Sequence, residues 1–187
     1  MLEILSPPDC HLKKEQVDWL RDVVRLGDPT DKRGLIFLSH HPYISAFREH
    51  YERPGEQIQA LLGDEFREII WFWGHDHRLV VYNKGQHGKG PVAYGRCIGH
   101  GGLPVEIKMP DSEEEQQKIM LYDRRVRKVV RRHQLGYNGF AKLHLEGAKL
   151  TVEYRDLEDC CIIEEQWQVN IANGQFIWNI VSGLADS

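Results

Sequence analysis

The chain has 187 residues, 41% of them hydrophobic and 28% charged, which is an ordinary composition for one globular domain with a sizeable core. Its formal net charge of −4 argues against a general nucleic-acid binder, because such proteins are basic. No apolar run approaches the roughly 20 residues that span a bilayer, and the first residues lack the basic and apolar segments of a secretory signal, so we expect neither a membrane partner nor secretion.

The cysteines and histidines carry further compositional information. No two of the four cysteines are spaced as a CxxC pair, so we expect neither a thiolate zinc site nor a redox dithiol. We also expect no disulfide framework, and a reducing cytoplasm is then the predicted location. The 10 histidines are unusual, and histidine both binds transition metals and transfers protons near neutral pH.

The first elements expected along the chain are a strand and a helix. Residues 1–5 (MLEIL) predict a short apolar strand. Residues 12–26 predict a helix, because apolar side chains recur on one face, at Val17, Leu20 and Val24. The Gly-Asp-Pro run at 27–29 is expected to stop this helix.

Two continuous apolar runs follow, separated by a second helix. Residues 34–39 (GLIFLS) and 69–73 (IIWFW) are typical of buried parallel strands. Between them, Pro54 fits the first turn of a helix and Gly63 fits its end.

The middle of the chain predicts two strands and a charged segment. The strands are expected at 78–82 and 92–97, on either side of a glycine-rich loop at 83–90. Residues 111–133 are acidic first and basic later, an order that favours a solvent-exposed helix, and a mobile insertion is the alternative. A nucleic-acid role is the less favoured interpretation of its arginine cluster, which comprises Arg124, Arg125, Arg127, Arg131 and Arg132.

The last part of the chain is expected to be β-rich. Glu-Gly-Ala at 146–148 and Asn-Gly at 173–174 are hairpin turn signals. The strands that flank these two turns are predicted at 140–145, 150–154, 167–171 and 176–181.

Two short histidine motifs carry the chemistry of this sequence. Residues 38–42 (LSHHP) and 74–77 (GHDH) each come directly after one of the buried strands, and the carboxyl ends of such strands are where catalytic groups collect. A lone His-x-His is more often ordinary loop chemistry, and His41 alone would more often be a packed histidine. The two motifs in this order are more specific, and they predict imidazoles at one edge of a sheet.

Strand geometry suggests how these imidazoles converge. Gly74 permits a tight turn after the strand. Alternation along an extended chain would then let His75 and His77 point the same way while Asp76 points away. With His40 from the neighbouring strand, three imidazoles could bind metal.

The two motifs resemble the last two metal-binding motifs of the calcineurin-like metallophosphoesterases. Residues 16–20 (QVDWL) resemble the helix that precedes the first of these motifs in many members, and residues 99–102 (GHGG) resemble a small glycine-rich loop beside the site. The resemblance covers roughly residues 1–155. Residues 156–187 are expected to form a β-hairpin extension packed on the same domain.

The resemblance implies an α/β fold, a four-layer sandwich of mixed sheets with flanking helices, and a dinuclear centre. Two ions, commonly Mn, Fe or Zn, clamp a phosphoester and activate a bridging hydroxide. Carried over by motif, His40 and His75 match ligands of one metal, and His77 matches a ligand of the other. His41 and His100 match no ligand position, and they are candidates for supporting a ligand or contacting phosphate.

The family's earlier motifs, DxH, GDxxD and GNH, are absent from this sequence. The chain is therefore expected to be the C-terminal half of the fold, truncated and inactive alone, with a missing N-terminal half or self-association completing it. Both buried strands would then expose apolar surface. Two alternatives stay open: a non-catalytic remnant or interaction module, and a mononuclear zinc hydrolase using His40, His75 and His77.

Overall fold

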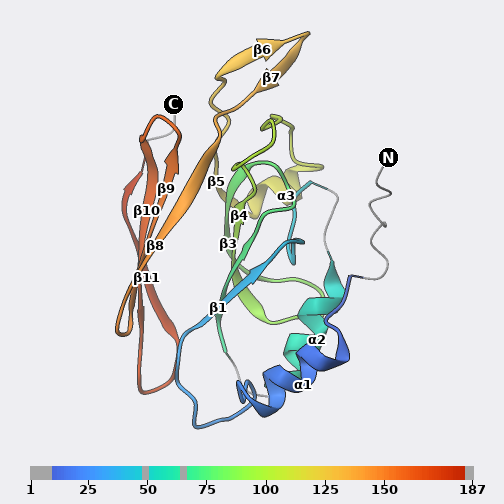
Figure 1. Cartoon of the computed structure of the whole chain (residues 1–187), viewed down its shortest axis with the longest axis vertical. Helices are drawn as coiled ribbons and strands as arrows, with labels where there is room; N and C mark the ends of the chain where they lie inside the picture. The colour runs from blue at the N-terminus through green and yellow to red at the C-terminus, as the bar shows by residue number, and fades with distance from the viewer. Residues whose placement is uncertain (1–9, 48–50, 64–66, 184–187) are drawn as a thin grey trace.

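The computed structural model describes residues 10–47, 51–63 and 67–183, and Figure 1 shows their arrangement. The strand predicted at residues 1–5 lies outside the described residues. The elements in chain order are α1 Lys14–Asp22, β1 Leu35–Ser39, α2 Glu52–Leu62, β2 Ile69–Trp73, β3 Leu79–Gln86, β4 Val92–Ile98, α3 Glu113–Gln117, β5 Ile119–Tyr122, β6 Lys128–Val130, β7 His133–Leu135, β8 Gly139–Glu146, β9 Lys149–Asp156, β10 Cys161–Val169 and β11 Phe176–Gly183.

Five strands form the sheet that carries both histidine motifs, which we call the central sheet. Its order is β1-β2-β4-β3-β5. β2 is parallel to both of its neighbours, β1 and β4, whereas β3 runs antiparallel to β4 and β5. The two apolar runs of the sequence are therefore adjacent parallel strands, as predicted, and their carboxyl ends lie side by side.

A second sheet, which we call the C-terminal sheet, is antiparallel with the order β11-β10-β9-β8. Gly147 and Gly174, with φ of 59° and 70°, lie in the two predicted hairpin turns, where a positive φ favours glycine. The predicted boundary between residues 155 and 156 falls inside β9, and β10 pairs with β9 along most of its length. The expected α/β class, mixed sheet and β-rich C-terminal end are confirmed.

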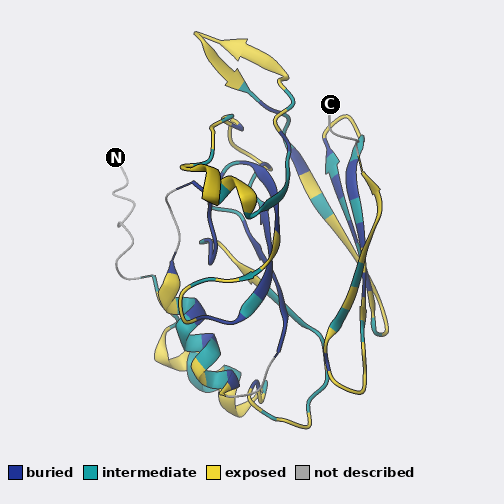
Figure 2. Ribbon diagram, turned by 180° about the vertical axis from the view of Figure 1, so that it is seen from behind, coloured by how far each residue is buried: buried dark blue, intermediate teal, exposed yellow. Residues whose placement is uncertain are grey.

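β2 shows how the layers are built. All five of its residues are buried. Ile69, Trp71 and Trp73 pack in a core with the helical side of the molecule, whereas Ile70 and Phe72 pack in a second core against the C-terminal sheet. The described chain therefore forms helix, sheet and sheet layers, and the buried strands run through the middle (Figure 2). The expectation that IIWFW exposes apolar surface is wrong, because both of its faces are covered.

β1 is different, because it is the edge strand of the central sheet. Its last two residues are exposed, and Leu38 is 73% exposed. Of the two strands that were predicted to expose apolar surface, only β1 does so. No helix in the described part of the chain is long and apolar enough to cross a membrane.

Three predicted boundaries are wrong. α1 stops at Asp22 rather than at residue 26, and the chain leaves the helical path before Leu26, which is buried in the core after Arg25 takes a φ of 60°. β3 continues to Gln86 into the predicted glycine-rich loop. β10 begins at Cys161 rather than at residue 167.

The helix predicted over residues 111–133 is also wrong. Only Glu113–Gln117 is helical, and the apolar residues that follow form β5, whose Leu121 and Tyr122 pair with the edge of β3. Pairing and partial burial of these side chains outweigh the charge order that favoured a helix. The arginine cluster lies on or near the small β6–β7 hairpin, where Arg131 and Arg132 occupy the turn with positive φ.

An ion pair joins the two sheets. Arg96 of β4 and Glu165 of β10 are both fully buried, with Nη2 and Oε1 2.7 Å apart and Nε and Oε2 2.9 Å apart. The hydroxyl of Tyr154 and the indole N–H of Trp178 donate to the same carboxylate at 2.6 and 2.9 Å. Four donors on one carboxylate compensate for its removal from water.

We expect Arg96→Met to lower the free energy of unfolding by about 3–5 kcal/mol, because Glu165 would be left as a buried charge without its guanidinium partner. Adding Glu165→Leu should restore much of the loss, since the double variant buries no charge. Urea denaturation monitored by circular dichroism measures both effects. Lys142→Met, at the exposed pair with Glu153, is the control and should change little. Equal effects of Arg96→Met and Lys142→Met would contradict this role.

Candidate metal centre

The candidate site begins where β1 and β2 end. Ser39 pairs with Trp73 in the last register position, so His40 and Gly74 are the first residues beyond the two strands. The carbonyl of His40 accepts the backbone N–H groups of Gly74 at 3.2 Å and His75 at 2.8 Å. These bonds tie the two motif loops together beyond the sheet.

Three imidazoles converge there. The ring centroids of His40, His41 and His75 lie 4.8–5.1 Å apart in pairs, and one ligand nitrogen from each lies within 4.8 Å of the others. Nδ1 of His75 is 3.2 Å from Nε2 of His40. The prediction that His40 and His75 meet at the carboxyl edge of the sheet is confirmed.

The separation between the His40 and His75 nitrogens fits two ligands of one metal ion. A tetrahedral ion with metal–nitrogen bonds of about 2.0–2.1 Å separates two ligand nitrogens by about 3.3–3.4 Å, close to the distance between His75 and His40. Imidazole suits Zn, Fe, Cu and Ni more than Mg or Ca. Among the described residues the group contains no carboxylate, so these ligands fit a single ion and do not by themselves fit a dinuclear centre.

His77 does not belong to this group. The alternation argument assumed an extended chain, but residues 75–78 form a bend, so alternation no longer determines where His77 points. Asp76 is buried, and its Oδ2 accepts a hydrogen bond from the Ser45 hydroxyl at 3.0 Å. The role of His77 as ligand of a second metal stays a prediction.

His41 joins the group although the motif gave it no ligand position. Its Nδ1 lies 3.3 Å from Sγ of Cys10, and its ring packs edge-on against Tyr51 at 4.6 Å between centroids. The Ser39 hydroxyl also donates to its carbonyl at 2.8 Å. Burial raises the pKa of the Cys10 thiol, which favours its neutral form. Neither Cys10 nor Tyr51 stood out in the sequence, because each depends on a contact distant in the chain.

His100 is brought near the motif loops but not into the group. Gly99 lies so close to the 74–77 loop that an added Cβ would be 1.9 Å from the Asp76 carbonyl oxygen. His100 is 2% exposed and lies beside Gly139. Burial lowers the pKa of His100 below its ordinary value.

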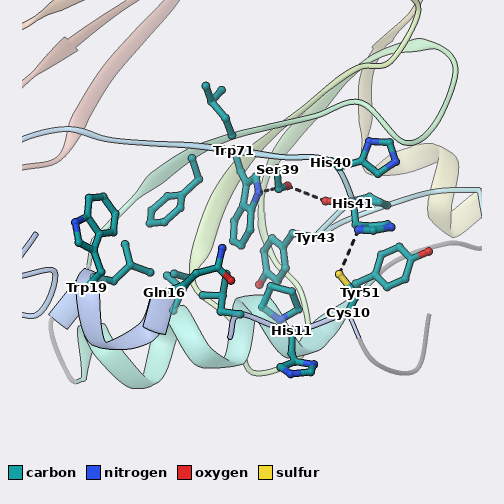
Figure 3. A pocket seen from close by; sticks show the side chains of 17 residues that line it. Cys10, His11, Gln16, Trp19, Ser39, His40, His41, Tyr43, Tyr51 and Trp71 are labelled. Atoms are coloured by element: carbon teal, nitrogen blue, oxygen red, sulfur yellow. Dashed lines mark hydrogen bonds between the residues drawn. The ribbon is translucent and has the colours of Figure 1, made fainter. Parts of the chain in front are cut away.

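A cavity of about 410 Å³ opens beside the imidazoles, and Figure 3 shows the side chains that line it. His40 and His41 form part of its wall at one end, next to Cys10 and Tyr51. Trp19 of α1 lies at the other end. The candidate metal centre is therefore connected to a space that could hold a small molecule.

No protein-family model matches this chain, and no curated protein matches it. The metallophosphoesterase resemblance therefore depends on the two motifs, and it is taken further below only as a proposal.

We expect the chain to bind one Zn²⁺ ion, and His75→Ala or His41→Ala to weaken binding at least ~10–100-fold, the loss typical of disturbing even an outer partner of a metal ligand. His77→Ala is the matched control and should bind like the wild type. Isothermal titration calorimetry gives the affinity and stoichiometry of each variant. A large loss in His77→Ala together with none in His41→Ala would contradict the observed group and favour the set of ligands expected from the motif.

We also expect His100 to make stability depend on pH. Because its pKa is lower in the folded chain than its ordinary 6.5, the unfolded chain binds the proton first as the pH falls. Stability should be complete above about pH 6.5 and decrease below it. Urea unfolding from pH 8 to 5.5 should show a flatter dependence for His100→Gln than for wild type. His144→Gln, at an exposed position on β8, should retain the wild-type dependence, and an unchanged slope in His100→Gln would refute this assignment.

Proposed function

We propose that this chain carries the histidine side of a metal centre of the metallophosphoesterase type and takes part in metal-dependent hydrolysis of a phosphoester. One observation carries the proposal. His40 and His75, which follow β1 and β2 in the family's motif order, present ligand nitrogens 3.2 Å apart at the carboxyl edge of these two adjacent parallel strands.

The fold supports this proposal. A four-layer sandwich of this family has two sheets face to face with helices outside them. The described residues supply helices, a mixed central sheet and a facing antiparallel sheet in that order. We infer that the chain corresponds to the C-terminal half of such a sandwich.

The protein's own residues would hold and orient a divalent ion. His40 and His75 would bind it from two loops joined by backbone hydrogen bonds, and His41 would bind it from a ring held by Cys10 and Tyr51. When bound, such an ion supplies Lewis acidity toward a phosphoryl oxygen. Nitrogen ligands favour Zn or Fe among the family's metals, and Mn is the third candidate.

The second ion of a dinuclear centre needs negative charge. Two dications about 3.5–4 Å apart repel each other strongly, and a bridging carboxylate offsets this repulsion. The three-histidine group has no carboxylate among the described residues. We therefore propose that carboxylate ligands come from an N-terminal half of the fold or from a self-associated copy.

A mononuclear zinc hydrolase is the second candidate, and His41 is the observation that favours it. Three imidazoles are a known ligand set for catalytic zinc, and the structure brings together three histidines without requiring His77.

A cytoplasmic location is also a proposal, and the four free cysteines support it because disulfides are rare in the reducing cytoplasm.

We expect the chain alone to hydrolyse p-nitrophenyl phosphate and its bis ester negligibly, even with Mn²⁺ or Zn²⁺, because the three-histidine group has no carboxylate among the described residues to hold a second ion. Inorganic phosphate should nevertheless bind to the zinc-loaded chain, and this binding should disappear in His75→Ala. Release of p-nitrophenol and phosphate calorimetry are the two measurements.

Each outcome separates the candidates. Robust turnover that disappears in His75→Ala would overturn the half-site proposal and favour the mononuclear enzyme. Absence of both zinc and phosphate binding would leave the non-catalytic module as the better account. His77→Ala is the control, because it changes a neighbouring histidine outside the three-histidine group.

A further inference from the structure

The cavity beside the candidate metal centre has an aromatic lining. We name it the aromatic groove, after the five aromatic side chains that line it: Trp19, Phe37, Tyr43, Tyr51 and Trp71. Figure 3 shows Tyr51 next to His41 at one end, Tyr43 and Trp71 in the middle, and Trp19 at the far end. Helix α1, the edge strand β1 and helix α2 all contribute side chains to it.

The groove is already formed in this structure. The indole N–H of Trp71 donates to the Ser39 hydroxyl at 2.9 Å, and Tyr43 stacks on Trp71 with centroids 4.8 Å apart and planes 18° apart. The amide side chain of Gln57 holds the backbone of Leu12 through two hydrogen bonds of 2.7 and 2.9 Å. These contacts fix the buried aromatic side chains behind the groove and the backbone at Leu12, which also lines it.

The chemistry of the groove differs from one end to the other. Tyr43, Tyr51 and Trp71 are buried behind its wall, so the aromatic surface that a flat hydrophobic group could contact comes from Trp19 and the half-buried Phe37. Trp19 is 55% exposed although tryptophan is usually well buried, so its indole is available for stacking. At the other end stand His40 and His41, two members of the three-histidine group. A ligand with phosphate at the histidines would therefore direct its remaining part along aromatic surfaces.

We propose that the aromatic groove binds the planar aromatic group of a phosphoester whose phosphate lies at the three-histidine group. This inference rests on the proposed function, because the histidines recognise phosphate through a bound metal ion. The cavity volume of about 410 Å³ falls in the range of small-ligand sites, about 300–1,000 Å³. The substrate class is thus an aryl or nucleoside phosphate in preference to a phosphate of a sugar or an aliphatic alcohol.

The test compares ligands that carry the phosphate, the aromatic group or both. 2-Naphthyl phosphate, adenosine monophosphate, glycerol phosphate and 2-naphthol are titrated into the zinc-loaded chain by calorimetry. We expect at least one of the two aromatic phosphates to bind about 3- to 10-fold more tightly than glycerol phosphate, the gain typical of one aromatic contact. Whichever binds more tightly distinguishes an aryl from a nucleoside source.

Variants then locate the preference. Trp19→Ala and Phe37→Leu each remove a flat surface from the aromatic groove, and they should reduce the preference for the aromatic phosphate while leaving glycerol phosphate binding unchanged. Val23→Ala is the matched control, because Val23 is 67% exposed just beyond the same helix and does not line the groove. Trp19→Phe should retain part of the preference. Circular dichroism confirms that each variant is folded.

The outcomes separate this inference from the proposed function. Equal binding of all three phosphates by the wild type, or a preference unchanged in both groove variants, would overturn the aromatic groove as the specificity site. If no phosphate binds but 2-naphthol does, and Trp19→Ala removes that binding, the aromatic site is supported. In that case it is the proposed phosphate site that fails.

Discussion

Arg96 and Glu165 form a fully buried ion pair between the central and C-terminal sheets. A charge buried without its partner is strongly unfavourable, so any sliding of one sheet over the other would be resisted as the pair separates. Tyr154 and Trp178 direct two further donors to the same carboxylate. β4 is thereby held in place, and β2, its parallel neighbour, packs against the same apolar layer. The loops that carry the histidines begin from these positioned strands.

The candidate site illustrates how much depends on the end of a strand. Parallel pairing of β1 and β2 ends at Ser39 and Trp73, and the His40 carbonyl then accepts the backbone N–H groups of Gly74 and His75, which brings His40 and His75 together. The positions of the other side chains at the site depend on contacts between loops. Cys10 and Tyr51 fix the ring of His41, and the close approach of Gly99 packs the 99–102 loop against the 74–77 loop. The same local geometry leaves the aromatic groove open beside the histidines.

Much of the fold could be predicted from the sequence, because continuous apolar runs and Asn-Gly turns report local preferences directly. The β5 strand could not, since residues 119–122 become a strand only where the edge of β3 is available to pair with them. The candidate site also has a part that could be predicted and a part that could not. His40 and His75 follow from strand positions, whereas the inclusion of His41 in place of His77 depends on a bend at residues 75–78 and on a thiol from the start of the described chain.

The position of β1 at the edge of its sheet has a consequence for how an ion would enter and leave. His75 extends from a strand that is hydrogen-bonded on both sides and covered on both faces, whereas His40 extends from a strand paired on one side only. Amide exchange at β1 should therefore be faster than at β2, since its outward groups open without disturbing the core. Opening of β1 would therefore carry His40 away from His75 only if the two backbone hydrogen bonds to the His40 carbonyl also broke.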